Sequence, residues 1–104
     1  MSTETQDRIE KSVLRIDGEL SIYRATELKQ TLLASLDQTR ELEIDLAAVT
    51  ELDTAGVQIL MMVKRQAQAT QRKLHLVGHS PAVLEVFELL NLAAYFGDPL
   101  VISG

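Results

Sequence analysis

Residues 42–57, in the middle of the chain, read LEIDLAAVTELDTAGV. Residues 42–46 alternate between apolar and acidic side chains, and this alternation predicts a strand with one buried face. Asp53 stands immediately before a helical pattern, so we expect its carboxylate to cap a helix that runs to about Ala69. A strand that leads into a helix is the basic unit of α/β folds, and this part of the chain therefore predicts an α/β domain.

The segments before this stretch are predicted to form two strands and a helix. Residues 12–16 and 19–22 carry the apolar side chains of two short strands. They flank Asp17-Gly18, a dipeptide typical of two-residue hairpin turns because both turn positions need positive φ. Residues 24–36 place apolar side chains at steps of three and four, which predicts a helix. The N-terminal part is therefore expected to be a β-hairpin followed by a helix.

The segments after it continue the alternation. The predicted elements are a strand, a helix, a turn and a short final strand, at residues 73–77, 81–90, 97–99 and 100–102. Ser80 is a favourable helix cap and Pro81 a favourable first helical residue. Asn91 readily adopts a left-handed conformation and is expected to end this helix. Helices that join successive strands favour parallel pairing, so the sheet should contain parallel strands.

The composition is that of one small globular domain. The chain has 104 residues, of which 46% are hydrophobic and 24% charged, and these values argue against intrinsic disorder. It has no cysteine, so disulfides, thiolate metal sites and cysteine nucleophiles are excluded. No apolar run is long enough to cross a membrane, and the N-terminus lacks the apolar core of a signal peptide. We expect a flexible tail at residues 1–9, a single domain at residues 10–104, and a cytoplasmic location.

The charge of the chain restricts the class of partner. Ten Lys and Arg residues against fifteen Asp and Glu residues give a net charge of −5. The densest basic clusters are the pairs Lys64-Arg65 and Arg72-Lys73, whereas nucleic-acid binding needs a concentrated basic surface. Binding to nucleic acid and insertion into a membrane are therefore not expected. A protein partner with a basic patch would be attracted to this chain.

The central helix is predicted to carry two stripes of side chains. One stripe should pack on the sheet, and it consists of Gly56, Ile59, Leu60, Val63 and Ala67. The second stripe consists of Thr54, Val57, Met61 and Arg65. A helix that covers one face of a sheet needs only one apolar stripe. The second stripe either packs under a neighbouring helix or forms an exposed docking face, since exposed apolar patches often mark interfaces and methionine adapts to several partners.

Thr54 has two interpretations. It can share the capping of the helix with Asp53. Alternatively, it is a hydroxyl at a helix N-terminus, where backbone N–H groups and the helix dipole tolerate an added anion. A phosphate there adds a charge of about −1.5 to −2. The fold could tolerate this charge, whereas an interface over Val57 and Met61 would be weakened, which is the behaviour of a reversible switch.

The residue types needed for catalysis are poorly represented. His75 and His79 are too few for a metal site, which needs about three convergent ligands. Asp45 and Asp53 have no neighbouring nucleophile or base that would complete a triad. The glycines are isolated, so no phosphate-binding loop is present. We therefore expect no enzyme activity, no catalytic residue, no metal and no cofactor.

Residues 44–57 resemble the signature of STAS domains, in particular the bacterial anti-sigma-factor antagonists. In that family a strand ends in a loop that carries Asp-Ser-Ser/Ala-Gly at the start of a helix, and here the corresponding residues are Asp53-Thr54-Ala55-Gly56. Similar segments recur at residues 17–20, 25–28 and 76–92, so the resemblance covers about residues 12–102. It implies a STAS fold: a mixed sheet of four to five strands with about three to four helices packed mainly on one side.

The resemblance also implies partner switching. In this family the unphosphorylated antagonist binds a GHKL-type serine/threonine kinase or anti-sigma factor, the kinase phosphorylates the hydroxyl at the helix start, and a PP2C-type phosphatase removes the phosphate. Carried over by position, the phosphorylated residue is Thr54. The expected partner-binding residues are Asp53, Thr54, Ala55, Gly56, Val57, Met61 and Arg65.

Two alternatives to this interpretation remain open. Thr54 and Ala55 stand where many antagonists have two serines, and threonine occurs there in some STAS proteins, including a subunit of a bacterial phospholipid-transport ABC complex. The chain could therefore be a constitutive STAS adaptor in which Thr54 contacts a partner without being modified. A small enzyme is the third possibility, and turnover of a substrate by the isolated chain would distinguish it.

Overall fold

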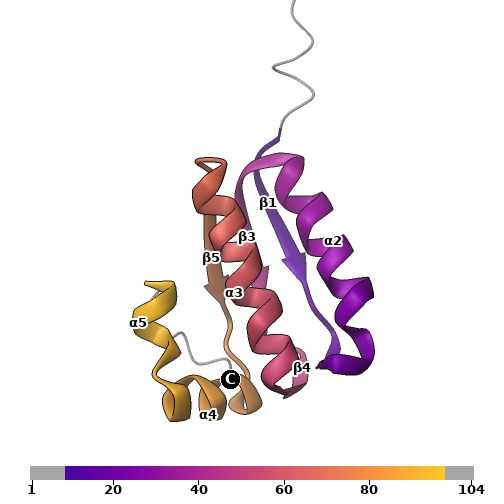
Figure 1. Ribbon diagram of the computed structural model, residues 1–104, viewed down its shortest axis with the longest axis vertical. Helices are drawn as coiled ribbons and strands as arrows, with labels where there is room; N and C mark the ends of the chain where they lie inside the picture. Colours follow the sequence, from indigo (N-terminus) through magenta and orange to yellow (C-terminus); the bar gives the residue numbers. More distant parts are fainter. Residues whose placement is uncertain (1–8, 98–104) are drawn as a thin grey trace, which may run out of the picture.

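The computed structural model describes residues 9–97, in which strands alternate with helices (Figure 1). The elements in chain order are β1 (Ile9–Arg15), β2 (Gly18–Leu20), the 3-10 turn η1 (Ile22–Arg24), α2 (Ala25–Asp37), β3 (Thr39–Asp45), β4 (Val49–Leu52), α3 (Thr54–Ala69), β5 (Lys73–Val77), α4 (Pro81–Leu90) and α5 (Leu92–Phe96). The α/β class is thereby confirmed. The predicted strand at residues 100–102 and most of the predicted tail lie outside the described residues, while residue 9 belongs to β1.

The described strands form two parallel sheets rather than one sheet. One has the order β1-β3-β5, and the other pairs β2 with β4. In the first sheet, Ile44 of β3 lies opposite Leu14 of β1 and Leu76 of β5. The side chains of β3 and β5 alternate between buried and partly exposed, which places the apolar face of the sheet on the core.

The predicted hairpin at Asp17-Gly18 is wrong. Gly18 has a φ of 84°, but Asp17 is not among the described residues with positive φ, whereas a two-residue hairpin turn needs positive φ at both positions. The N–H of Gly18 instead donates to the carbonyl oxygen of Ala48 at 3.0 Å. The chain therefore leaves β1 for the second sheet, where β2 pairs with β4.

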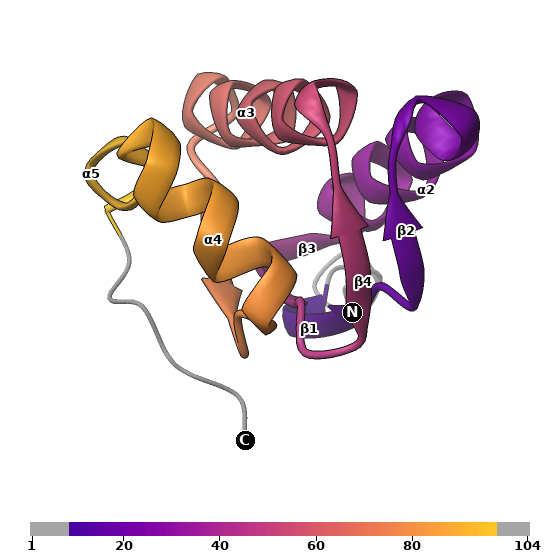
Figure 2. The same cartoon turned by 90° about the horizontal axis from the view of Figure 1, so that it is seen from below.

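Helices α2 and α3 lie side by side over one face of the three-stranded sheet, and α4 lies at one end of the molecule, where it packs against β4 (Figures 1 and 2). The helices predicted before β3, after Asp53 and after Ser80 are present, as is the strand at residues 73–77. Ser80 caps α4 by accepting the N–H of Val83 at 3.2 Å, and Asn91 ends this helix with a φ of 56°. Strand β4 and helix α5 were not predicted. They have four and five residues, respectively, and elements this short give no clear periodic pattern in the sequence.

Candidate functional site

Asp53 joins two elements at the start of α3. As predicted, it is the N-cap residue, and its Oδ1 accepts the N–H of Gly56 at 2.9 Å. Its Oδ2 accepts the N–H of Ile22 in η1 at 3.0 Å. These hydrogen bonds hold the pKa of Asp53 below its ordinary value of 3.8, and the one from Gly56 has the largest effect on the pKa. The carboxylate is therefore ionised at neutral pH and fixes η1 against the first turn of α3.

Thr54 is the first residue of α3 and is exposed to solvent. In the part of the chain that the structure describes, its hydroxyl makes no hydrogen bond, and the cap of α3 is supplied by Asp53. The backbone N–H groups of the first helical turn and the helix dipole give this position a positive partial charge. The hydroxyl is thus accessible to a modifying enzyme, at a place where the backbone favours an anion.

Gly56 is buried on the inner side of α3, as predicted. A Cβ atom at this position would lie 2.8 Å from Cδ1 of Leu52 and still closer to the carbonyl oxygen of Leu20. The absence of a side chain lets the first turn of α3 approach the end of β2. Ala55, the residue before it, is half-buried.

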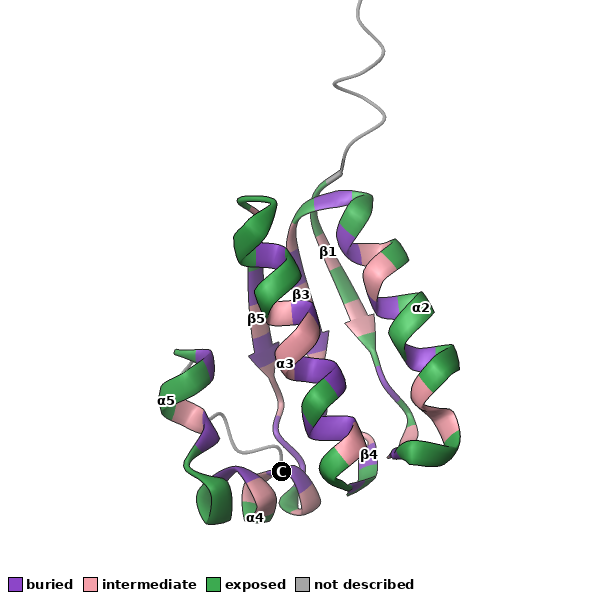
Figure 3. Ribbon diagram, in the orientation of Figure 1, coloured by how far each residue is buried: buried purple, intermediate pink, exposed green. Residues whose placement is uncertain are grey.

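Of the two interpretations of the second stripe on α3, the structure supports packing at Val57 and contradicts an exposed docking face there. This side chain is only 5% exposed and belongs to the hydrophobic core. Met61 is half-buried and packs against the core, whereas Arg65 is exposed. The physical reason is that α3 packs against α2 and η1 as well as against the strands, so it buries a wider face than one stripe (Figure 3). The water-facing side of the helix begins at Thr54 and continues through the exposed Gln58.

The apolar surface beside Thr54 is supplied by η1, which the sequence analysis did not single out. Ile22 is 65% exposed and Tyr23 is 88% exposed. Asp53 binds the N–H of Ile22, and the hydroxyl of the buried Ser21 accepts the N–H of Tyr23 at 3.3 Å. Both side chains therefore project from a well-anchored turn. The sequence signal that could have identified them is an apolar pair directly after a capping serine.

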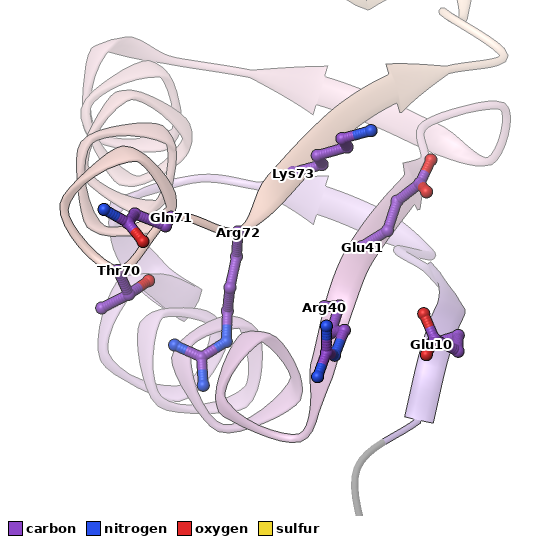
Figure 4. A pocket seen from close by; sticks show the side chains of 7 residues that line it. All are labelled: Glu10, Arg40, Glu41, Thr70, Gln71, Arg72 and Lys73. Atoms are coloured by element: carbon purple, nitrogen blue, oxygen red, sulfur yellow. The ribbon is translucent and has the colours of Figure 1, made fainter. Parts of the chain in front are cut away.

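Two of the hollows among the described residues lie at opposite ends of α3. The smaller, of about 180 Å³, adjoins the site and is lined by Ser21, Tyr23, Glu51, Leu52 and Asp53. The larger, of about 410 Å³, is lined by Glu10, Arg40, Glu41, Thr70, Gln71, Arg72 and Lys73 (Figure 4). In the larger hollow, the side chains of Arg72 and Lys73 point in different directions (Figure 4), and Nε of Arg72 donates to the carbonyl oxygen of Thr39 at 3.0 Å. A third hollow, of about 320 Å³, lies between α2 and α3 and is lined by Leu33, Ala34, Leu36, Asp37, Gln66 and Arg72. The hollow of about 180 Å³ is the candidate site, because it is the one of these hollows that is lined by Asp53, the residue next to Thr54.

The histidines are structural or lie on the sheet surface. His75 pairs through Nε2 with Glu41 at 3.1 Å on the outer face of the sheet. His79 is buried, and its ring centroid lies 5.3 Å from that of Phe87. Among residues 9–97, no group of three or more His, Asp or Glu side chains is placed to hold a metal ion. Within the same residues, no helix is both long and apolar enough to span a bilayer.

Comparisons with known proteins agree on the family. A family model described as "Mlab, STAS domain" matches residues 3–102. The anti-sigma-B factor antagonist of Staphylococcus aureus (strain NCTC 8325 / PS 47) is 26% identical over 93 residues, which cover 88% of this chain and 84% of that protein. A crystal structure of an anti-sigma factor antagonist from Mycobacterium paratuberculosis superposes with a TM-score of 0.77 and 29% identity, covering 91% of this chain and 80% of that one. The structure of the anti-sigma factor antagonist SpoIIAA in its unphosphorylated form superposes with a TM-score of 0.70 and 21% identity. The match covers 86% of this chain and 80% of the SpoIIAA chain, and at this identity it supports the fold alone.

Proposed function

The chain belongs to the STAS domain family, and on this premise we propose that it is a regulatory protein-binding module of a bacterial partner-switching pathway. Its partner is a GHKL-type kinase or anti-sigma factor, and phosphorylation of Thr54 releases that partner. A PP2C-type phosphatase restores the binding form. The module itself is not an enzyme and acts in the cytoplasm. The named relatives that are anti-sigma factor antagonists support this proposal.

One observation carries the proposal: the exposed Thr54 begins a helix whose cap, Asp53, is hydrogen-bonded to η1, the turn that carries the exposed Ile22 and Tyr23. We infer that Ile22 and Tyr23 form the apolar part of the docking surface. Thr54, Met61 and Arg65 extend it along α3. Asp53, Ala55 and Gly56 shape the helix start, and the buried Val57 supports the surface from below. This surface replaces the exposed docking face on α3, which was one of the two interpretations of the second stripe.

Phosphorylation of Thr54 would act on the interface more than on the fold. The N-terminal dipole of α3 partly offsets the new charge, so the helix should remain intact. In a complex, the phosphate and the ionised Asp53 would both have to lose water next to the apolar surface of η1. An uncompensated charge at an interface costs several kcal/mol, which is enough to reverse partner binding.

The test is phosphorylation of the purified chain by its cognate kinase with ATP, followed by intact-mass measurement. Addition of one phosphate to the wild type and none to Thr54→Ala is expected. Thr54→Glu should weaken partner binding by about tenfold or more while its thermal unfolding stays close to that of the wild type. Thr31→Glu is the matched control, since it adds the same charge to an exposed threonine in the middle of α2. Equal binding by Thr54→Glu and the wild type would contradict the switch.

A second candidate function is a constitutive adaptor, for example in a phospholipid-transport ABC complex. The pair Thr54-Ala55, in place of the two serines of many antagonists, favours it. In that case the chain would take up no phosphate from any kinase, and Thr54→Ala would bind the partner more weakly because a contact is lost. The mass measurement and the binding measurement together distinguish the two functions.

A further inference from the structure

The hollow beside Thr54 has the size of a side-chain site. Its volume of about 180 Å³ is below the range of roughly 300–1,000 Å³ that is typical of small-molecule and cofactor sites. One wall is Tyr23 of η1, and Leu52 of β4 contributes an apolar surface. A single side chain from a docked protein would fill this space, whereas a nucleotide or a cofactor would not fit.

The charge of the hollow is negative. It has two carboxylates, those of Glu51 and Asp53, and the described residues that line it include no cation. Asp53 is ionised and cannot turn away, because both of its oxygens accept backbone N–H groups. Glu51 is exposed, and among residues 9–97 no hydrogen bond or ion pair engages its carboxylate. Arg24, the cation of η1, instead donates to the carbonyl oxygens of Asp17 and Glu19.

The aromatic wall selects one kind of cation. Tyr23 is 88% exposed, so one or both faces of its ring are open to a ligand. A guanidinium group stacks on an aromatic ring and also forms paired hydrogen bonds with a carboxylate, whereas an ammonium group is a strongly hydrated point charge. The ring and the two carboxylates together therefore fit arginine better than lysine.

We propose that this hollow receives an arginine side chain of the partner protein, with the guanidinium group between the ring of Tyr23 and the carboxylates of Glu51 and Asp53. This arginine is the anchor of the docking surface, since buried arginines and tyrosines often dominate the energy of interfaces. The proposal rests on the proposed function for the existence of a partner. It adds the residue type that the partner presents and the three residues of this chain that bind it.

The test uses a probe that requires neither a kinase nor a partner. N-acetyl-arginine-N-methylamide is titrated into the isotopically labelled chain, and backbone amide shifts are followed by NMR. Saturable shifts are expected at residues 21–23 and 51–54. The matched probe is the citrulline analogue, which has the same shape without the charge, and it should produce little shift. The lysine analogue, which has the charge without the planar group, should bind more weakly than arginine.

Variants of the lining residues identify the site. Glu51→Gln and Tyr23→Leu change exposed side chains and should each lower the probe affinity by about two- to fivefold. Glu85→Gln, which removes the same charge from the exposed side of α4, should leave the affinity unchanged. Equal binding of the citrulline probe, or shifts that spread over the acidic surface and persist in both variants, would overturn the proposal.

The two proposals fail in different ways. Thr54→Glu adds negative charge near the hollow, so it should keep or increase the affinity for the free arginine probe. Partner binding should still weaken, because a docked protein, unlike the small probe, removes water from the new charge. If the arginine probe binds at the hollow but Thr54→Glu binds the partner as well as the wild type does, only the phosphorylation switch is contradicted. If Thr54→Glu loses partner binding but the arginine probe does not bind at the hollow, only the arginine site is contradicted.

Discussion

At the scale of single residues, Gly56 determines how closely α3 can approach the second sheet. The carbonyl oxygen of Leu20 accepts the N–H of Asp53 at 3.3 Å, and the same oxygen lies where a side chain at position 56 would begin. The obstacle is backbone, which cannot rotate away as a flexible side chain can. The helix start, with Thr54 on its outer side, is therefore positioned by the absence of one methyl group.

Gly56→Ala should destabilise the protein by about 1–3 kcal/mol, because overpacking forces α3 away from β2. This loss is expected even though alanine favours a helix over glycine by about 1 kcal/mol. Urea unfolding measures the change. Gln58→Ala, at an exposed position of the same helix, is the control and should change stability little. Gly56→Ala with wild-type stability would show that the helix start can move outward at no cost.

The site residues differ in how well the sequence predicted them. The capping by Asp53 and the position of Thr54 at the helix start follow from local rules, because both depend on a hydrogen bond within the first turn of the helix. The burial of Val57 depends on which helix lies beside α3, and the spacing of apolar residues within α3 does not contain that information. The prominence of Tyr23 likewise depends on how η1 meets α3 in the folded chain.

At the scale of elements, the junction between η1 and α3 depends on one carboxylate. Asp53 accepts N–H groups from both elements, and these bonds favour its charged form. The sign of the pH dependence follows from the lowered pKa. The folded state binds the proton less tightly than the unfolded chain, so the stabilising contribution is present above the ordinary pKa of 3.8 and is lost as the pH falls through the lower, folded-state pKa.

Asp53→Asn tests this junction, because asparagine can still cap α3 through its one amide oxygen, but it carries no charge and cannot also accept the N–H of Ile22. The wild type should be more stable than Asp53→Asn at neutral pH, and the difference should shrink as the pH falls below 3.8. Urea unfolding at neutral and acidic pH measures both quantities. Glu85→Gln serves as a control for the general loss of acidic charge. A stability difference that is constant with pH would contradict the assigned role of the charge.

Elements that follow from short-range signals agree with the prediction, as does the parallel pairing of β3 with β5, whereas the predicted pairing of β2 with β1 does not. The caps at Asp53, Ser80 and Asn91 are local, and the helices begin and end where these residues predict. The dipeptide Asp17-Gly18 is compatible with a hairpin, yet β2 pairs with β4 across a long stretch of chain. Choosing between those pairings requires the rest of the core, because a local turn preference is worth less than the burial of an apolar strand.

At the scale of the whole molecule, the two sheets share one hydrophobic core. Buried side chains of both sheets and of all the α-helices form a single cluster. Leu20 of β2 is fully buried within it, although β2 itself is only three residues long. The short second sheet, which carries η1 and the hollow, is therefore stabilised by the same contacts as the larger sheet.

The chain should accordingly unfold in one cooperative transition. Leu20→Ala should lower the stability by about 2–5 kcal/mol and shift the unfolding of both sheets together. Far-UV circular dichroism and residue-specific amide signals during urea unfolding measure this. Leu89→Ala is the control, since this leucine is 80% exposed and its loss should have little effect. Separate loss of the β2 and β4 signals at lower urea would contradict a shared core.

The amino-acid sequence by itself determined the α/β class, the helix caps, the STAS likeness and the position of Thr54 at a helix start. These features depend on side-chain periodicity and on hydrogen bonds between near neighbours in the chain. Only the tertiary structure decided that Val57 is buried, that the strands divide into two sheets, and that η1 brings Tyr23 beside Asp53. Those features arise from packing between segments far apart in the sequence, where the total apolar area removed from water, and not any local preference, selects the arrangement.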